Sequence, residues 1–471
     1  MSSGHAAAAR AIQIARAAVF LLWCRAGRRN AMAVADLPLP PGSDGMPVVG
    51  EMNHWWLDPL GFAQERHARY GPVFRTHLLG RPCAVLLGPE ANRFILGSHT
   101  HLFSSRDGWS RTLTALIGDG LSLIDGAQHR RHRSMIMPAL HATAVPRYLG
   151  LMQRLVEAHA DVWLRAGEIR LFDGFKHLSF AVAAGAILGL PDGPQARAFA
   201  HEFHVFSRGL FAFPAWRLPF LPFGRAWGAA QDLRRTLAGI ITERRRRPDD
   251  SMLSMLIAAR DADGQGFSDA ELVDELLVLL WAGHDTITSL LTWACYELLR
   301  HPAELAGLRA ELAATLGEAP LRAEQLRQLP YLDRALREAE RLHPPAPGGF
   351  RGVVEEFAYG GYRIPKGWTV MYSSVFTHMM PELWREPERF DPERFAPPRE
   401  EGRHPFHLIG FGGGPRVCVG LAFAQLQMRV VLAHLLRRLD LALVPGQSFR
   451  AVPVPTKMPW DGLRVTVRPR R

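Results

Sequence analysis

Cys418 has the most distinctive chemical setting of any thiol in the chain. It stands in a glycine-rich segment, Phe411 to Gly420 (FGGGPRVCVG), directly before a helical run that continues to Leu436. A helix N-terminus offers free backbone N–H groups and a positive dipole end, which favour a thiolate. Glycines let the backbone pass close to a large planar ligand. The segment therefore predicts a thiolate beside a bound group.

The other three cysteines are Cys24, Cys83 and Cys295, which lie far apart and form no CxxC motif. This spacing argues against a disulfide framework or a structural zinc site and favours a reducing, cytoplasmic compartment. An isolated cysteine is usually a small buried apolar residue. Cys418 is the one thiol that needs another explanation.

The residues around Cys418 resemble the haem-ligand loop of the cytochrome P450 family, F-x-x-G-x-R-x-C-x-G. The matching positions are Phe411, Gly414, Arg416, Cys418 and Gly420. The resemblance implies haem b, with Cys418 as the axial thiolate and metal ligand, Phe411 beside the sulfur and Arg416 on a propionate. It also implies a mainly α-helical, cytochrome P450-like fold with a small β-sheet region.

Segment 282–288 (AGHDTIT) resembles the oxygen-activation segment of the same family, [AG]-G-x-[DE]-T-[TS]. That chemistry needs a small residue where dioxygen and substrate crowd the helix, together with a hydroxyl and an acid that deliver protons. The resemblance assigns these catalytic roles to Gly283, Thr286 and Asp285. Ile287 departs from the pattern, which often has a second hydroxyl there, and this changes the water chain or the pocket wall.

Basic residues on a predicted helix are candidates for holding the haem propionates. His129 and Arg133 stand four residues apart, on one helical face, and resemble the family's H-x-x-x-R pattern. Arg351, which follows the later E-x-x-R helix, is a further cofactor-binding candidate by its position. Arg130 and Arg131 are expected to face solvent.

Glu338 and Arg341 form an E-x-x-R pair near the end of a predicted helix. Taken alone, such a pair is a solvated surface interaction. The resemblance implies instead that Arg394, in a later P-E-R-F segment, joins them in a buried charge network. That network would support the fold rather than take part in the reaction.

The composition of the chain is that of a globular protein, with 471 residues of which 48% are hydrophobic and 21% charged. Length alone suggests roughly three domains. Helical patterns cover 151–166, 195–210, 226–247, 269–300, 302–316 and 327–343, and strand-like runs cover 73–78, 84–87, 362–364 and 369–372. Because strands come from both sides of the helical region, we expect one haem domain over residues 37–471.

Residues 1–36 precede that domain as an extension. Their apolar stretch, residues 11–24, is shorter than the roughly 20 residues that a spanning helix needs. It is an untranslated or disordered extension, a weak peripheral membrane anchor or an export signal. Met32 and Met46 are alternative starts.

The formal net charge of +11 admits an acidic protein, an anionic membrane surface or nucleic acid as partner. No nucleic-acid-binding motif is recognised. No reductase, flavin or iron–sulfur segment follows Gly420, so we expect a separate electron donor, such as a ferredoxin or flavodoxin with its reductase. Arg130, Arg429, Arg437 and Arg438 form a plausible docking face, and we expect a monomer.

An aromatic, proline-broken stretch, residues 203–227, predicts either a lid over an apolar pocket, a membrane contact or ordinary core packing. Segments 76–82 and 361–368 resemble the branch that hydroxylates retinoids, related isoprenoids or fatty acids, while secondary-metabolite tailoring stays open. The predicted function is a haem-thiolate monooxygenase that uses O2 on a small lipophilic substrate. Alternatives are a peroxide-using hydroxylase or isomerase, against which Asp285 and Thr286 argue, and a non-catalytic haem-binding sensor or carrier.

Overall fold

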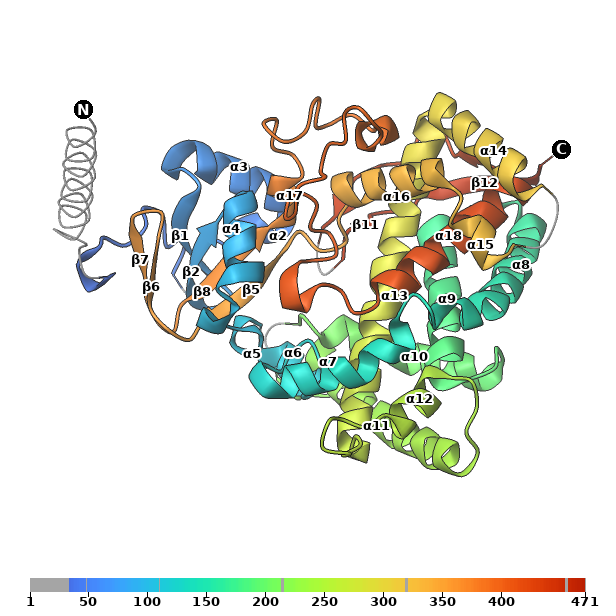
Figure 1. Ribbon diagram of the computed structural model, residues 1–471, viewed down its shortest axis with the longest axis horizontal. Coiled ribbons are helices and arrows are strands. Elements are labelled where there is room, and N and C mark those ends of the chain that lie inside the picture. Colours follow the sequence, from blue (N-terminus) through green and yellow to red (C-terminus); the bar gives the residue numbers. More distant parts are fainter. Residues whose placement is uncertain are drawn as a thin grey trace, which may run out of the picture.

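Helices form most of the structure, and the largest sheet lies at one end of the molecule (Figure 1). The structure is a computed structural model, and it describes residues 34–47, 49–109, 111–212, 216–317, 321–453 and 456–470. The predictions for the apolar stretch 11–24 and for Cys24 lie outside the described residues. The mainly α-helical fold with a small β region is confirmed.

The main sheet joins strands from distant parts of the chain, in the order β1-β2-β8-β5-β3. Its strands are β1 (Val73–Leu78), β2 (Arg81–Leu86), β3 (Phe103–Ser104), β5 (Gly348–Val353) and β8 (Thr369–Ser373). β1 and β2 form an antiparallel hairpin, and β2 pairs in parallel with β8 so that Cys83 stands opposite Thr369. The expectation that strands from both sides of the helical region share a sheet is therefore confirmed.

Three smaller sheets complete the β structure. They are β4 (Glu168–Arg170) with β12 (Arg464–Pro469) and β9 (Leu439–Leu443), β6 (Phe357–Tyr359) with β7 (Tyr362–Ile364), and β10 (Ala451–Val452) with β11 (Met458–Pro459). Of these strands only β7 was predicted. The others are short, and their pairing depends on partners far away in the sequence.

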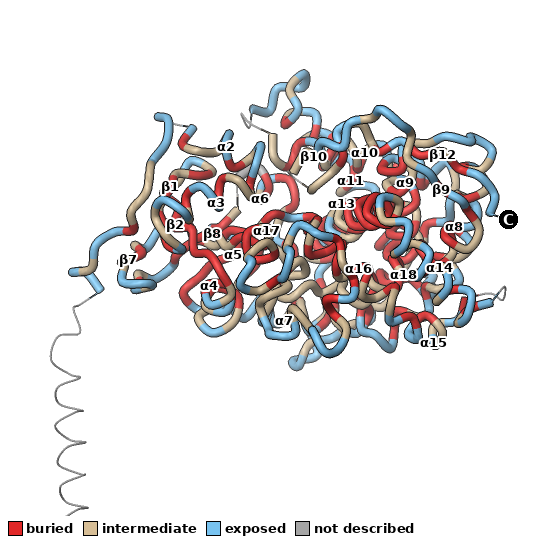
Figure 2. Tube along the Cα trace, turned by 90° about the horizontal axis from the view of Figure 1, so that it is seen from above, coloured by how far each residue is buried: buried red, intermediate tan, exposed pale blue. Residues whose placement is uncertain are grey.

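The central helix is α13 (Asp269–Arg300), which carries the AGHDTIT segment. Ser268 and Glu271 form a capping box at its start, which satisfies two backbone N–H groups there. Most of the helix is buried, as its red trace in Figure 2 shows, because α9, α11, α16 and α18 pack around it. A helix buried on nearly all sides can place residues of its middle in the interior of the protein.

Besides α13, five helices had predicted ranges, and these five agree with the structure within four residues at each end. The longer helices other than α13 are α3 (Pro59–Tyr70), α7 (Gly126–Leu140), α8 (Leu149–Ala166), α9 (Leu171–Ala183), α10 (Pro194–Gly209), α11 (Pro222–Arg246), α14 (Pro302–Leu316), α16 (Pro330–Leu342) and α18 (Leu421–Arg438). The shorter ones are α2 (Met52–Leu57), α4 (Pro89–Arg93), α5 (Ser105–Gly108), α6 (Arg111–Ile117), α12 (Met252–Ala258), α15 (Ala323–Leu326) and α17 (Ser374–Thr377). The starts of α11 and α16 differ most from prediction, because Pro222 and Pro330 occupy the first turn, where a missing N–H costs nothing.

Within the described residues, one segment, Leu171–Leu188, is long and apolar enough to cross a membrane by length and composition. It comprises α9 and the π-helical turn that follows. Of this segment, 72% is buried inside the fold, where α9 packs against α13 and α8. Its apolar composition is thus accounted for by core packing.

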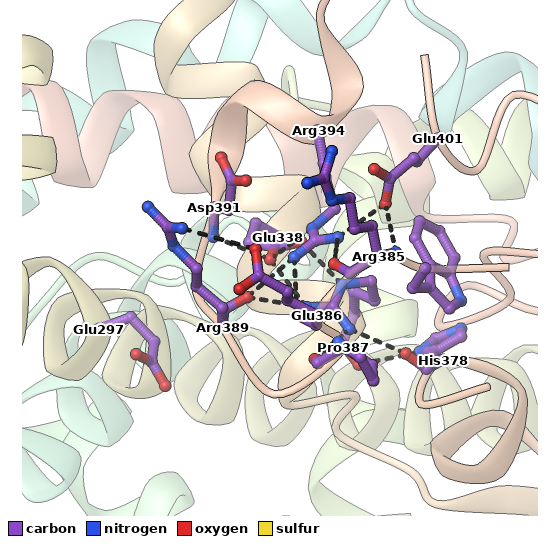
Figure 3. A network of polar contacts seen from close by, with 12 residues as sticks. Glu297, Glu338, His378, Arg385, Glu386, Pro387, Arg389, Asp391, Arg394 and Glu401 are labelled. Carbon is purple, nitrogen blue, oxygen red and sulfur yellow. Dashed lines mark hydrogen bonds and ion pairs between the residues drawn. The ribbon is translucent and has the colours of Figure 1, made fainter. Parts of the chain in front are cut away.

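The buried charge network around Glu338 is confirmed (Figure 3). The Glu338 carboxylate accepts hydrogen bonds from Nε of Arg341 at 2.8 Å and from Nε of Arg394 at 2.9 Å, and all three side chains are fully buried. Glu401 also pairs with Arg394, at 2.7 Å. The network ties α16 to the segment 385–401, which leads toward the Cys418 loop.

Candidate functional site

The loop that carries Cys418 folds back on itself. The Cys418 N–H donates to the Phe411 carbonyl at 2.9 Å, and a 3-10 turn spans Gly414–Arg416. Gly414 has φ +60°, and a Cβ there would lie 1.8 Å from the Leu96 carbonyl oxygen, so only glycine fits. This glycine is therefore required by a close approach to the protein's own backbone, whereas the sequence suggested an approach to a planar ligand.

The ionisation of Cys418 differs from the expectation drawn from the helix N-terminus. Burial raises the pKa of the Cys418 thiol, while the Gly420 N–H and the charge of Arg133 act in the opposite direction. The raised pKa applies to the thiol without a bound group, whereas the prediction concerned a thiolate that ligates one. Desolvation of the sulfur outweighs the favourable dipole.

An apolar cavity of about 210 Å³ lies between this loop and the middle of α13. Gly283 and Thr286 line it from the helix, and Phe411 and Cys418 line it from the loop. Two motifs that lie more than 100 residues apart therefore face the same space. Further lining residues are Ala183, Ile187, Ala282, Ile287, Leu290 and Ala346.

Cations from three parts of the chain gather near Cys418. Arg133 on α7 is half-buried and, within the described residues, makes no hydrogen bond or ion pair. Arg351 on β5 donates to its neighbour's carbonyl, at Phe350, and pairs with no described carboxylate. Arg416 and Arg351 together line a small adjoining pocket.

Two of the predicted cofactor-binding residues are affected by their protein surroundings: Arg416 has hydrogen-bond partners in the protein, and His129 has a lowered pKa. Arg416 donates to Asp125 at 2.6 Å and to the Ile124 carbonyl at 2.5 Å, and burial lowers its pKa to about 10. Burial, followed by the charges of Arg416 and Arg133, lowers the pKa of His129 to about 4. His129 is therefore a neutral hydrogen-bonding group at pH 7, among arginines that stay charged.

This donor set fits haem. A single thiol lines an apolar cavity, and half-buried guanidinium groups with too few carboxylates stand beside it, which suits a planar group that carries two carboxylates. No cluster of three or more histidine, cysteine, aspartate or glutamate side chains suited to a metal ion occurs among the described residues. A haem iron needs no such cluster.

Arg131 does not face solvent as predicted. Its guanidinium pairs with Asp261 at 2.6 Å and with Glu271 at 2.8 Å, and it donates to the Gly266 carbonyl. These partners come from the start of α13 and the segment that precedes it. The neighbouring Arg130 is exposed, as expected.

Asp285 points away from the cavity. Its Oδ1 lies 3.1 Å from Nε2 of His284 and 4.0 Å from Nζ of Lys176 on α9. Burial alone would raise the pKa of Asp285, but His284 and Lys176 outweigh it and hold the pKa at about 2. The acid of the predicted pair is thus a charged carboxylate on the side of α13 that faces α9.

Thr286 lines the cavity one residue further along the helix. Its hydroxyl donates to the Ala282 carbonyl at 2.7 Å, one turn back. This bond uses the proton and leaves the oxygen lone pairs open toward the cavity. Asp285 and Thr286 therefore lie on adjacent faces of α13, one buried among charges and one beside the open space.

The site combines a loop that carries a thiol, arginines that lie near it, and an interior helix with an acid and an alcohol. This combination defines a haem-thiolate protein. The chain belongs to the cytochrome P450 family, whose sequence model matches residues 40–460. It is a cytochrome P450 monooxygenase, and members of this family bind iron protoporphyrin IX through a cysteine thiolate.

Individual relatives support this assignment over nearly the whole chain. The putative cytochrome P450 120 of Synechocystis sp. is 35% identical, over 91% of this chain and 97% of that protein. Human cytochrome P450 26C1 is 34% identical, over 95% of this chain and 92% of that protein. The solved structure of retinoic acid bound cyanobacterial CYP120A1 has a TM-score of 0.86 and 34% identity, and it covers 92% of this chain and 100% of its own.

Sequence reasoning missed several residues of the site. Lys176 and His204 flank Asp285 from α9 and α10, and burial, then the charge of Lys176, lowers the pKa of His204 to about 3. Glu340 lines the cavity from α16. The signal for Glu340 was present as a second acid inside the E-A-E-R run, but only the three-dimensional packing shows which way it faces.

Proposed function

We propose that this enzyme inserts one atom of O2 into a C–H bond of a lipophilic substrate of the retinoid or related isoprenoid class, with residues 37–471 acting as one haem domain. The observation that carries the proposal is the apolar cavity shared by Cys418 and Thr286. Its walls present almost no polar side chain that could recognise a hydrophilic molecule. A fatty acid or an apolar secondary metabolite would meet the same walls.

In this proposal Cys418 is the iron ligand and Phe411 packs beside its sulfur. Arg133, Arg351 and Arg416 hold the propionates, and neutral His129 adds a hydrogen bond. Arg133 and Arg351 have guanidinium N–H groups to spare, whereas Arg416 can serve while Asp125 orients it. When bound, haem supplies the activation of dioxygen at the expense of two electrons from a separate protein.

Gly283, Thr286 and Asp285 serve the reaction from α13. Gly283 has no side chain, and beyond its chain neighbours and its own helix backbone no atom lies within 4 Å of where its Cβ would be, so the helix leaves room for small molecules at this point. Thr286 accepts and passes on a proton at its hydroxyl oxygen, which faces the cavity. Asp285 exchanges protons with bulk water on the opposite side, where Lys176 is partly exposed.

The retinoid assignment is supported by the relatives. The solved cyanobacterial structure with a TM-score of 0.86 is one with retinoic acid bound. Ile287, which replaces the hydroxyl residue of the motif, is buried and lines the cavity. It adds an apolar wall that suits an isoprenoid chain.

The surface arginines bear on where a separate electron donor would dock. Arg429 and Arg438 of the predicted docking face are paired with Asp333 and Asp161, so this face has less free positive charge than the sequence indicated. Exposed Arg130 remains available to an acidic ferredoxin or flavodoxin.

The aromatic stretch 203–227 divides into two parts. Phe203, Phe206 and Phe223 are buried core residues, whereas Trp216 and Phe220 are 62% and 66% exposed. Phe213 lies outside the described residues. We assign the exposed pair to peripheral contact with a lipid surface from which an apolar substrate would enter.

The test of the proposal starts with the reduced, carbon monoxide-bound protein. We expect the red-shifted Soret band of a thiolate ligand, and we expect Cys418→Ser to lose it while Cys295→Ser keeps it. All-trans retinoic acid, palmitate and a macrolide are then titrated into the ferric protein, with a spin-state shift at the lowest concentration for the retinoid. Turnover under labelled O2 should place one labelled atom in the product, and a wild-type protein without the thiolate band would refute the assignment.

A further inference from the structure

Glu340 is a buried acid of the cavity that has no role in the mechanism above. It lies on α16 between Glu338 and Arg341, yet it takes no part in their network. Its side chain is 7% exposed and lines the cavity together with Cys418. Within the described residues it makes no ion pair, since the nearby Arg337 packs on the Phe395 ring instead.

The Glu340 side chain packs tightly against the segment that leads into the thiol loop. A Cβ built on Gly410 would lie 2.5 Å from Cγ and 2.6 Å from Oε1 of Glu340. The backbone amides of Gly410 and Phe411 lie close enough to favour the ionised carboxyl, which opposes the effect of burial on the pKa of Glu340. The Phe411 carbonyl in turn accepts a hydrogen bond from the Cys418 N–H. A single backbone hydrogen bond therefore connects the segment beside Glu340 to the residue that carries the thiol.

The preceding residue of the loop is also held from α16, through His378. Its Nε2 accepts the Ile409 N–H at 2.9 Å, and its Nδ1 donates to the Arg341 carbonyl at 3.1 Å. The Ile409 N–H is therefore held by a histidine attached to α16, and the next residue, Gly410, lies against the Glu340 side chain of the same helix. These contacts with residues 409 and 410 lie directly before the loop that carries Cys418.

A carboxyl at this position is costly, because burial raises the pKa of Glu340 to about 7 against the opposing charge of Arg337. An apolar side chain of similar size would avoid that cost but would leave the N–H groups of Gly410 and Phe411 without this acceptor. The gain that offsets burial is therefore the contact with the loop.

We propose that Glu340 is a positioning residue for the thiolate: its carboxyl holds the Gly410–Phe411 turn against α16 and so keeps Cys418 on the iron. The inference rests on the proposed role of Cys418. It assigns to α16 a second task beside the buried charge network, namely control of the ligand loop.

The test compares Glu340→Leu with Glu340→Gln in the haem-loaded protein. In the reduced carbon monoxide complex we follow the loss of the thiolate Soret band in mild urea. Glu340→Leu should lose the band about tenfold faster than wild type, while Glu340→Gln, which keeps an acceptor oxygen, should stay within about twofold. Asp333→Asn is the control: it removes an acid of the same helix outside the cavity, together with a partly exposed ion pair to Arg429, and should stay within about twofold of wild type.

Gly410→Ala provides a second variant if Glu340→Leu does not load haem. Its methyl group would collide with the carboxyl, so it should also speed loss of the band, and it should add nothing when Glu340 is replaced by alanine. Wild-type rates in Glu340→Leu, or in Gly410→Ala when that variant is the one measured, would overturn the proposal. A wild-type protein without the band would instead overturn the role of Cys418, whatever the variants do.

Discussion

Replacing Glu338 by glutamine tests how strongly the buried charge network stabilises the fold. The carboxylate accepts two hydrogen bonds from Arg341, one from Arg394 and one from the Asp391 N–H, at 2.8 to 3.0 Å. The amide keeps the shape but removes the negative charge between two fully buried guanidinium groups. Breaking a buried ion pair in this way costs about 3–5 kcal/mol, because the remaining charges lose their compensation.

The measurement is the free energy of unfolding in urea and the thermal midpoint of the haem-loaded protein. For 471 residues the unfolding entropy is about 1 kcal/mol per degree, so the loss corresponds to a midpoint of the helical circular dichroism signal that is lower by roughly 3–5 °C. Glu393→Gln is the control, since Glu393 pairs with Arg334 at 2.8 Å but is 51% exposed. It should cost less than about 1 kcal/mol.

A loss below about 1 kcal/mol for Glu338→Gln would refute this reasoning. It would mean that the backbone carbonyls around the two guanidinium groups carry the stabilisation without the carboxylate. Arg341 donates to the carbonyls of His378, Pro387 and Arg389, so this outcome has a physical route.

Three further predictions concern pH, proton delivery and membrane contact. Burial, then the charge of Arg341, lowers the pKa of His378 to about 3, so between that pH and 6.5 only the unfolded state binds this proton. The contribution of His378 to stability is therefore complete above pH 6.5 and about 2 kcal/mol lower at pH 5. Urea unfolding at the two pH values measures this difference, and His378→Gln should diminish it. Asp285→Asn should lower product formed per electron consumed while leaving the spin-shift affinity for substrate unchanged, and equal coupling would contradict its role. Trp216→Ser combined with Phe220→Ser should weaken binding to phosphatidylcholine–phosphatidylserine vesicles about tenfold in sedimentation, with circular dichroism as the folding control.

The sequence allowed good predictions where one short segment contains its own explanation. The glycine-rich turn before Cys418 and the extent of α13 each follow from local patterns, whereas the burial of the E-x-x-R pair was implied by the family resemblance and not by a local rule. The range of α13 was predicted to the residue from its helical pattern, and the structure shows that a capping box of Ser268 and Glu271 fixes its start.

Predictions failed where an outcome depends on what packs against a residue. Arg130 and Arg131 are neighbours, yet one is exposed and the other is ion-paired, because Asp261 and Glu271 reach α7 from a segment about 130 residues later. The pKa of Cys418 depends on packing in the same way. A helix dipole can be read from the sequence, whereas the desolvation of the sulfur depends on the whole cavity.

The position of α16 shows how the stability of this fold and its chemistry depend on the same helix. Glu338 and Arg341 fix α16 to the segment 385–401, and the Arg341 carbonyl orients the His378 ring that accepts the Ile409 N–H. Glu340 then meets Gly410. On α16, Glu340, which contacts the loop, lies between the network residues Glu338 and Arg341. A variant that weakens the network should therefore also weaken the contact with the loop, and the loop should detach before the rest of the fold unfolds. In Glu338→Gln the thiolate band should therefore disappear at lower urea than the helical circular dichroism signal, and coincident transitions would show that the network acts on global stability alone.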